Sequence, residues 1–266
     1  MALPQPSAST TALVTGASSG IGTALARALA ARGHGVTLVA RREERLRELA
    51  AELSDAVRAE VVGCDLADPD ARERMAAEIE SRGLQVEVVV NNAGFGSYGN
   101  FVDAEREREV EMVRLNVEAV VDLEARYLPA MVESGRGAVI NIASTSAFQP
   151  LPGSATYAAT KAFVLHHGDA LHAELKGSGV TVTSVCPGPV RTEFVEQAGM
   201  GGAEENTPGA VWMSADDVAE QAVEAAERGR RVVVPGTLNQ AGALLGQHAP
   251  RALLLPFTKR LWRQAR

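Results

Sequence analysis

Cysteine is scarce in this chain, with Cys64 and Cys186 the only two among 266 residues. Each ends an apolar run that is typical of a buried strand. Two thiols cannot build the disulfide framework of a small secreted domain, so we expect them to be free and buried in a cytoplasmic protein. The five histidines have no recognisable metal-ligand spacing with these cysteines, so we predict no metal site.

Excess positive charge and long hydrophobic runs are also missing. The formal net charge is -7, which argues against general nucleic-acid binding. No apolar run approaches the roughly 18 residues that a membrane span requires. Residues 1–10 lack the charged start of a signal peptide and instead resemble a short, loose arm. A hydrophobic content of 46% with mixed charges indicates a globular protein.

Short apolar runs alternate with helical patterns from Thr11 onward. Strands that are apolar throughout and separated by helices are typical of a parallel sheet covered on both faces. We therefore predict an α/β fold over residues 11–236, a single-domain Rossmann-type doubly wound parallel sheet of about seven strands. The expected strands are Ala12–Thr15, Val36–Ala40, Val61–Cys64, Val86–Val90, Ala138–Ile142, Val180–Cys186 and Arg231–Val234.

A glycine-rich turn follows the first expected strand, with the spacing Gly-x-x-x-Gly-x-Gly. Glycine lets the backbone turn sharply and approach a ligand, and the next helix offers free N–H groups at its positive end. This combination suits a dinucleotide diphosphate, although glycine-rich turns also occur without ligands. The residues expected to hold the cofactor here are Gly16, Ser18, Ser19, Gly20, Ile21 and Gly22.

The second strand ends without the acid that would hold the ribose hydroxyls of NAD. Arg41 and Arg42 follow Ala40 instead, and guanidinium groups suit a 2′-phosphate, so we predict NADP(H). In the alternative, these arginines only open a solvated helix. Further cofactor contacts are expected after the later strands, from Asp65, Leu66, Asn92, Ala93, Gly94, Pro187, Gly188, Val190 and Thr192.

Tyr157 and Lys161 are four residues apart in an expected helix, so their side chains share one face about 6 Å apart. A nearby cation favours the phenolate, and Tyr157 could then exchange protons as a general acid or base. Taken alone, the pair could equally be incidental on an amphipathic surface helix.

Together these motifs resemble the short-chain dehydrogenase/reductase family, from about Thr11 to Val234. The resemblance rests on residues 15–22, 91–94, 157–161 and 187–192, together with Ser144. It implies a catalytic tetrad of Asn116, Ser144, Tyr157 and Lys161. In that tetrad Ser144 holds the substrate oxygen, Tyr157 passes the proton, Lys161 lowers the tyrosine pKa and binds the nicotinamide ribose, and Asn116 fixes a water. It also implies a homodimer or homotetramer, built on the helices around residues 117–132 and 154–176.

Residues 189–213 resemble the mobile substrate lid of this family. Several large apolar residues could line a substrate pocket: Phe95, Tyr98, Phe148, Leu151, Phe194, Met200 and Trp212. Residues 237–266 form a basic amphipathic extension, since no Asp or Glu follows Glu227. A docked helix is the favoured interpretation of its end, and contact with an anionic membrane surface is the alternative.

The leading hypothesis is therefore an NADP(H)-dependent oxidoreductase that interconverts a hydrophobic carbonyl compound and its secondary alcohol. A 3-oxoacyl-thioester reductase is a close variant of this activity. A redox sensor that binds NADP(H) without turnover is the alternative from another class, although Tyr157 and Lys161 are both in place for catalysis.

Overall fold

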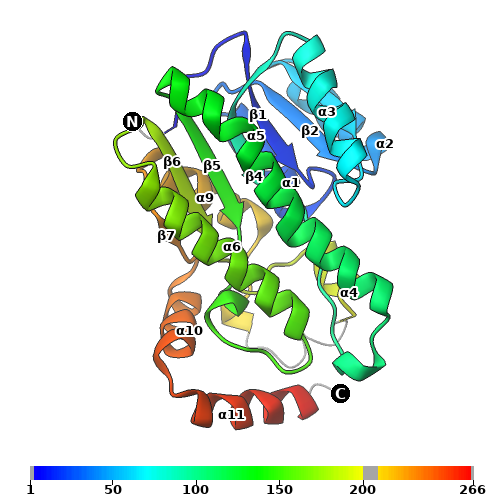
Figure 1. Cartoon of the computed structure of the whole chain (residues 1–266), viewed down its shortest axis with the longest axis vertical. Coiled ribbons are helices and arrows are strands. Elements are labelled where there is room, and N and C mark those ends of the chain that lie inside the picture. Colours follow the sequence, from blue (N-terminus) through cyan, green and yellow to red (C-terminus); the bar gives the residue numbers. More distant parts are fainter. Residues whose placement is uncertain (1–2, 200–208, 265–266) are drawn as a thin grey trace.

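A computed structural model describes residues 3–199 and 209–264, and it is built around one sheet of seven parallel strands in the order β3-β2-β1-β4-β5-β6-β7. This confirms the predicted fold class (Figure 1). Most strands match the expected segments to within two residues at each end. The strands are β1 (Thr10–Thr15), β2 (Val36–Ala40), β3 (Ala59–Gly63), β4 (Gln85–Asn91), β5 (Gly137–Ile142), β6 (Val180–Val185) and β7 (Val232–Val233).

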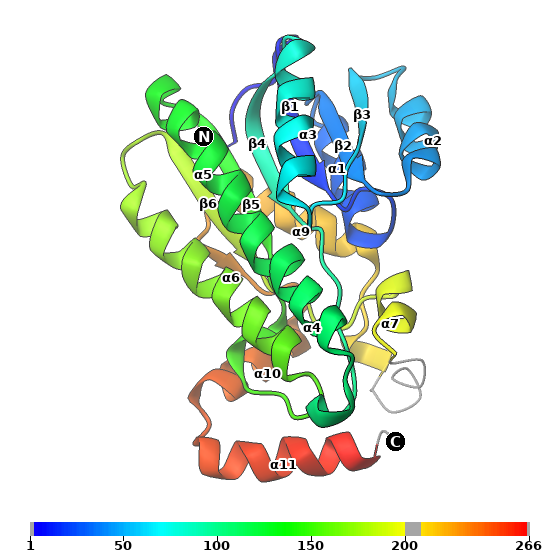
Figure 2. The ribbon, with the colours of Figure 1, turned by 45° about the vertical axis from the view of Figure 1, so that its right-hand side comes forward.

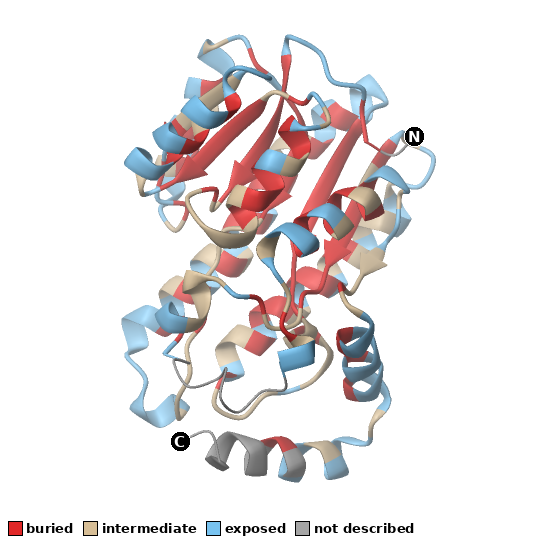
Figure 3. Cartoon of the chain, turned by 180° about the vertical axis from the view of Figure 1, so that it is seen from behind, coloured by how far each residue is buried: buried red, intermediate tan, exposed pale blue. Residues whose placement is uncertain are grey.

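Two helical layers cover the sheet, because successive residues of a strand point to opposite faces. In β1, Ala12 and Val14 belong to one hydrophobic core and Leu13 to the other. The first core is closed by α1 (Gly20–Ala30), α2 (Glu43–Leu53) and α9 (Ala215–Glu227). The second is closed by α3 (Pro69–Ser81), α5 (Ala119–Ser134) and α6 (Ala155–Glu174). Figure 3 shows the buried strands between these exposed outer helix faces.

The strand order reverses between β1 and β4, since β1 pairs with β2 on one side and with β4 on the other. In an open parallel sheet, the loops that leave two such strands diverge and create a crevice at the carboxyl edge. The loops after β1, β4 and β5 all meet at this edge. The glycine-rich turn, residues 92–94 and Ser144 are thereby brought together.

The N-terminal segment differs from the loose arm expected from its composition. Leu3 is buried and packs into the first core, and Thr10 already belongs to β1. Ser7 and Thr10 form a local turn through a backbone hydrogen bond of 3.3 Å. Burial of Leu3 removes apolar surface from water and so favours this placement of the segment.

The lid region and the C-terminal extension lie beside the carboxyl edge of the sheet (Figure 2). The described parts of residues 189–213 are α7 (Glu193–Gln197), a short 3₁₀ turn (Gly209–Val211), and a parallel bridge between Val190 and Met213. The mobility of this lid stays a prediction, and residues 200–208 lie outside the described residues.

Two helices make up the extension, α10 (Thr237–His248) and α11 (Arg251–Gln264). Buried Asn239 of α10 donates to the carbonyl oxygens of Val211 and Pro235, both at 3.1 Å, so α10 is docked on the domain. None of the helices in the described part of the chain is long and apolar enough to cross a membrane.

Candidate active site

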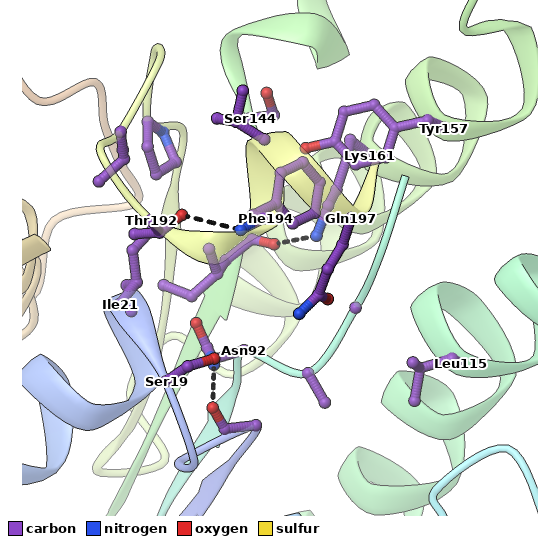
Figure 4. A pocket seen from close by; sticks show the side chains of 18 of the residues that line it. Ser19, Ile21, Asn92, Leu115, Ser144, Tyr157, Lys161, Thr192, Phe194 and Gln197 are labelled. Atoms are coloured by element: carbon purple, nitrogen blue, oxygen red, sulfur yellow. Dashed lines mark hydrogen bonds between the residues drawn. The ribbon is translucent and has the colours of Figure 1, made fainter. Parts of the chain in front are cut away.

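A cavity of about 590 Å³ opens at the carboxyl edge of the sheet, between the glycine-rich turn and α6 (Figure 4). It brings together every residue predicted to bind cofactor or act in catalysis, except Gly22 and Asn116, which lie directly behind its wall. The further lining residues were not assigned to cofactor binding, catalysis or the substrate pocket from the sequence: Ala40, Cys64, Leu115, Ile142, Ala143, Thr145, Ser146, Pro189, Val195 and Gln197.

Steric contacts in the first turn leave room only for glycine. Gly16 and Gly20 adopt φ angles of 65° and 55°, which disfavour residues with a side chain. A Cβ on Gly22 would lie 2.2 Å from the Gly16 carbonyl oxygen, so the helix could not follow the turn this closely. The turn is therefore a backbone cradle at the start of α1, and it fits a diphosphate group.

Thr15 and Asn92 hold this cradle against the end of β4. The Thr15 hydroxyl accepts from the backbone N–H groups of Asn92 and Ala93, each at 3.0 Å, and the Asn92 amide donates to the Thr15 carbonyl at 2.8 Å. Sequence reasoning assigned Asn92 to the cofactor and no role to Thr15. The structure adds Thr15 as the residue that fixes the spacing between the two loops.

Arg42 lies at the other end of the cavity, where β2 leads into α2. Its guanidinium donates to the Ser18 hydroxyl at 3.2 Å and to Glu193 of α7 at 2.8 Å. Arg41 is more exposed and lies 3.6 Å from Glu111. Both arginines line the cavity together with Asp65, so a 2′-phosphate on an adenosine ribose would meet positive charge here.

Three elements position the groups predicted to be catalytic. Ser144 follows β5, and its hydroxyl accepts from the backbone N–H of Ser146 at 3.1 Å. Tyr157 and Lys161 stand one turn apart on α6, and the Lys161 Nζ lies 5.9 Å from the tyrosine ring centroid. Lys161 is only 5% exposed, and its Nζ donates to the Ile142 carbonyl at 2.7 Å.

The titration of this pair differs from the expectation that Lys161 would lower the tyrosine pKa. Burial raises the pKa of Tyr157 to about 12, and a hydrogen bond with Ser144 offsets only part of this rise. Burial also lowers the pKa of Lys161 to about 8. For both residues, burial away from water is the main cause of the pKa shift. The Lys161 ammonium donates to the Ile142 carbonyl, so its hydrogen bond is directed at the backbone of β5.

Asn116 lies in a single π-helical turn, Arg114–Glu118, between α4 (Arg106–Val113) and α5. Such turns insert an extra residue into a helix and are frequent at functional sites. The buried amide of Asn116 donates to the Phe95 carbonyl at 3.0 Å and to the Thr160 hydroxyl at 3.1 Å, and it accepts from the Phe95 N–H. It thus joins the loop after β4 to the helix of Lys161.

The part of the cavity beside Tyr157 is mostly apolar. The Phe194 ring centroid lies 5.6 Å from that of Tyr157, and Trp212 and Val195 also line the cavity, whereas Leu115 lines it well apart from Tyr157 (Figure 4). Of the predicted pocket residues, Phe194 and Trp212 are therefore in place. Phe95, Tyr98, Phe148 and Leu151 are not among the lining residues: the Phe95 ring stacks under Arg108, and Phe148 packs on a small core cluster. Met200 lies outside the described residues.

The sequence profile of the short chain dehydrogenase family matches residues 10–201. The chain belongs to this family. It is 39% identical to sulfoacetaldehyde reductase 2 of Chromohalobacter salexigens over 184 residues, which are 68% of this chain and 73% of that protein. It is 37% identical to a very-long-chain 3-oxoacyl-CoA reductase of Anas platyrhynchos, over 69% of this chain and 60% of that protein.

The fold is also similar to solved structures of the family. A short-chain dehydrogenase from Sphingobium yanoikuyae in complex with NADPH superposes with a TM-score of 0.80 at 35% identity, over 93% of this chain and 95% of that one. The glycine cradle and the arginines at the end of β2 fit the same class of cofactor. The protein is an NADP(H)-dependent oxidoreductase.

Proposed function

We propose that this enzyme uses NADPH to reduce an uncharged, largely apolar ketone or aldehyde, and that it oxidises the corresponding alcohol in reverse. The apolar side chains of Phe194, which packs against Tyr157, and of Val195 and Trp212 in the cavity wall carry this proposal. Among the described lining residues, Lys161 is the one cation near Tyr157, and it is already bonded to the Ile142 carbonyl. The two arginines among the described lining residues, Arg41 and Arg42, follow β2 at the adenosine end.

The proposed roles follow from protonation and geometry. With a pKa of about 12, Tyr157 keeps its proton at neutral pH, so it can donate that proton to a carbonyl oxygen as general acid. Ser144 would hold the same oxygen, since it hydrogen-bonds Tyr157. Lys161 would bind the nicotinamide ribose, and Asn116 keeps the adjoining loop in place. When bound, the nicotinamide supplies the hydride.

A 3-oxoacyl-thioester reductase is the second candidate. The apolar wall suits an acyl chain, and the similarity to a 3-oxoacyl-CoA reductase favours this class of substrate. A panel of ketones and 3-oxoacyl thioesters of graded chain length separates the two proposals. Efficiency that rises steeply with acyl-chain length, and only for thioesters, would support the second.

Tyr157→Phe tests the proposed chemistry. It removes one hydroxyl and keeps the ring beside Phe194, so we expect carbonyl reduction to fall by about 10² to 10⁴ while NADPH affinity, measured by fluorescence titration, changes little. Persistent turnover in the variant would exclude Tyr157 as the acid. Tight NADPH binding by the unaltered protein without turnover on any carbonyl or alcohol would instead favour a redox sensor.

We also propose that the chain forms a homodimer or homotetramer through the α5 and α6 faces, in the cytoplasm. Val121 and Val132 of α5 and Phe163 of α6 are about two-fifths exposed, although each is a large apolar side chain. Burial of these side chains against a second copy would remove apolar surface from water. Both cysteines are free and buried, which is compatible with a reducing compartment.

A further inference from the structure

A carboxylate from the lid region pairs with the arginines at the adenosine end of the cavity. Glu193, the first residue of α7, accepts from the Arg42 guanidinium at 2.8 Å and from the Arg45 guanidinium at 2.5 Å. Arg42 also reaches the hydroxyl and the carbonyl oxygen of Ser18 in the glycine-rich turn, at 3.2 and 3.4 Å. The lid region, α2 and the diphosphate cradle therefore meet at a single guanidinium group.

We propose that Glu193 is a built-in competitor of the cofactor's 2′-phosphate, and that it thereby sets how strongly the enzyme prefers NADPH to NADH. This inference rests on the proposed assignment of Arg42 to that phosphate. It names a residue from the lid region, outside the glycine-rich turn and the β2 end, as a determinant of cofactor specificity.

Two negative groups would compete for the guanidinium of Arg42. A phosphate monoester carries between one and two negative charges near neutral pH, and Arg42 lies in the cavity wall where that group would bind. Arg42 and Arg45 lower the pKa of Glu193, so this carboxylate is ionised as well. Two anions at one guanidinium repel each other, so the phosphate of NADPH must displace Glu193. The 2′-hydroxyl of NADH carries no charge and leaves the ion pairs intact.

The size of the effect follows from the exposure of the three groups. The side chains of Arg42, Arg45 and Glu193 are about two-fifths exposed, so each ion pair is partly screened by water. Ion pairs that water screens in this way contribute little individually. Removal of the charge of Glu193 should accordingly tighten NADPH binding by about three- to ten-fold.

Glu193→Gln tests the inference, since glutamine keeps the size of the side chain and removes its charge. The dissociation constants of NADPH, NADH and adenosine 2′,5′-bisphosphate are measured by isothermal titration at low and high salt. We expect tighter binding of NADPH and the bisphosphate at low salt, a smaller gain at high salt, and an unchanged NADH affinity. Glu196→Gln is the matched control, because this exposed acid is on the same helix, and it should change none of the three constants.

Arg42→Gln separates this inference from the assignment on which it rests. We expect this variant to weaken NADPH binding and to abolish the gain from Glu193→Gln in the double variant. Weaker binding in Arg42→Gln with no gain in Glu193→Gln rejects the role of Glu193 alone. Unchanged NADPH binding in Arg42→Gln rejects the phosphate assignment and, with it, the competition. Weaker NADPH binding in Glu193→Gln would mean that Glu193 supports the arginine, contrary to the inference.

Discussion

The buried ammonium of Lys161 opposes folding, and its removal should stabilise the protein. Burial lowers the pKa of Lys161 from 10.5 to about 8, and each pKa unit corresponds to about 1.4 kcal/mol. The charged form therefore costs about 3 kcal/mol of folding free energy at neutral pH. Its hydrogen bond to the Ile142 carbonyl returns about 1 kcal/mol. Lys161→Met should thus raise the free energy of unfolding by about 2 kcal/mol while it abolishes turnover.

This gain should depend on pH. Because the folded pKa is below the unfolded one, the unfolded chain binds more protons between pH values of about 8 and 10.5. The free energy of unfolding of the unaltered protein should rise with pH across this window. The variant has no titrating group at position 161, so this contribution to the rise should be absent from it. The advantage of Lys161→Met is complete below the window and disappears above it.

Urea unfolding of the cofactor-free protein, followed by tryptophan fluorescence at neutral and alkaline pH, measures both effects. Lys176→Met is the control, since exposed Lys176 lies just beyond the same helix, and it should give no pH-dependent difference. A variant that is less stable than the parent at neutral pH would refute the reasoning. So would an advantage that persists above the window, because the gain would then come from packing and not from the removed charge.

Two further predictions concern the α5 and α6 face. The hydrogen bond with Glu124 raises the pKa of His167. The protonated His167 therefore stabilises the folded protein fully below the unfolded pKa of 6.5, and this contribution is lost as pH rises through the folded pKa. His167→Gln should therefore destabilise the protein more in mildly acidic than in alkaline urea titrations; an equal loss at both would contradict this. Phe163→Arg places a charge on the exposed apolar face, and light scattering should show dissociation toward monomer; an unchanged molecular mass would contradict the proposed interface.

The parallel sheet and its two helical layers could be predicted because β-strands that are buried on both faces contain continuous apolar runs. The cradle was predictable too, since a backbone with positive φ at Gly16 and Gly20 accepts little but glycine. Both are local properties of the chain. The placement of Leu3 was not predictable in the same way, because its partners in the core come from distant segments.

The electrostatics of the site could not be predicted from spacing. The four-residue separation of Tyr157 and Lys161 placed them correctly on one face of α6, but the pKa of each depends on burial by the surrounding elements. The same holds for Arg42, whose position after β2 was evident, whereas its partner Glu193 is 151 residues away. Phe95 and Phe148 were assigned to the pocket by their type alone and instead pack elsewhere.

Helix α7 links the two ends of the cavity, because two consecutive residues of this helix contact side chains at opposite ends. Glu193 holds the arginines at the adenosine end, and Phe194 packs against the ring of Tyr157 at the substrate end. Both side chains belong to one helix of five residues, so a shift of this helix would move the two together. If the 2′-phosphate displaces Glu193, as we propose, and α7 shifts with it, the wall of the substrate pocket would adjust in the same step. Cofactor recognition and substrate enclosure would then be one event, controlled by the charge at Glu193.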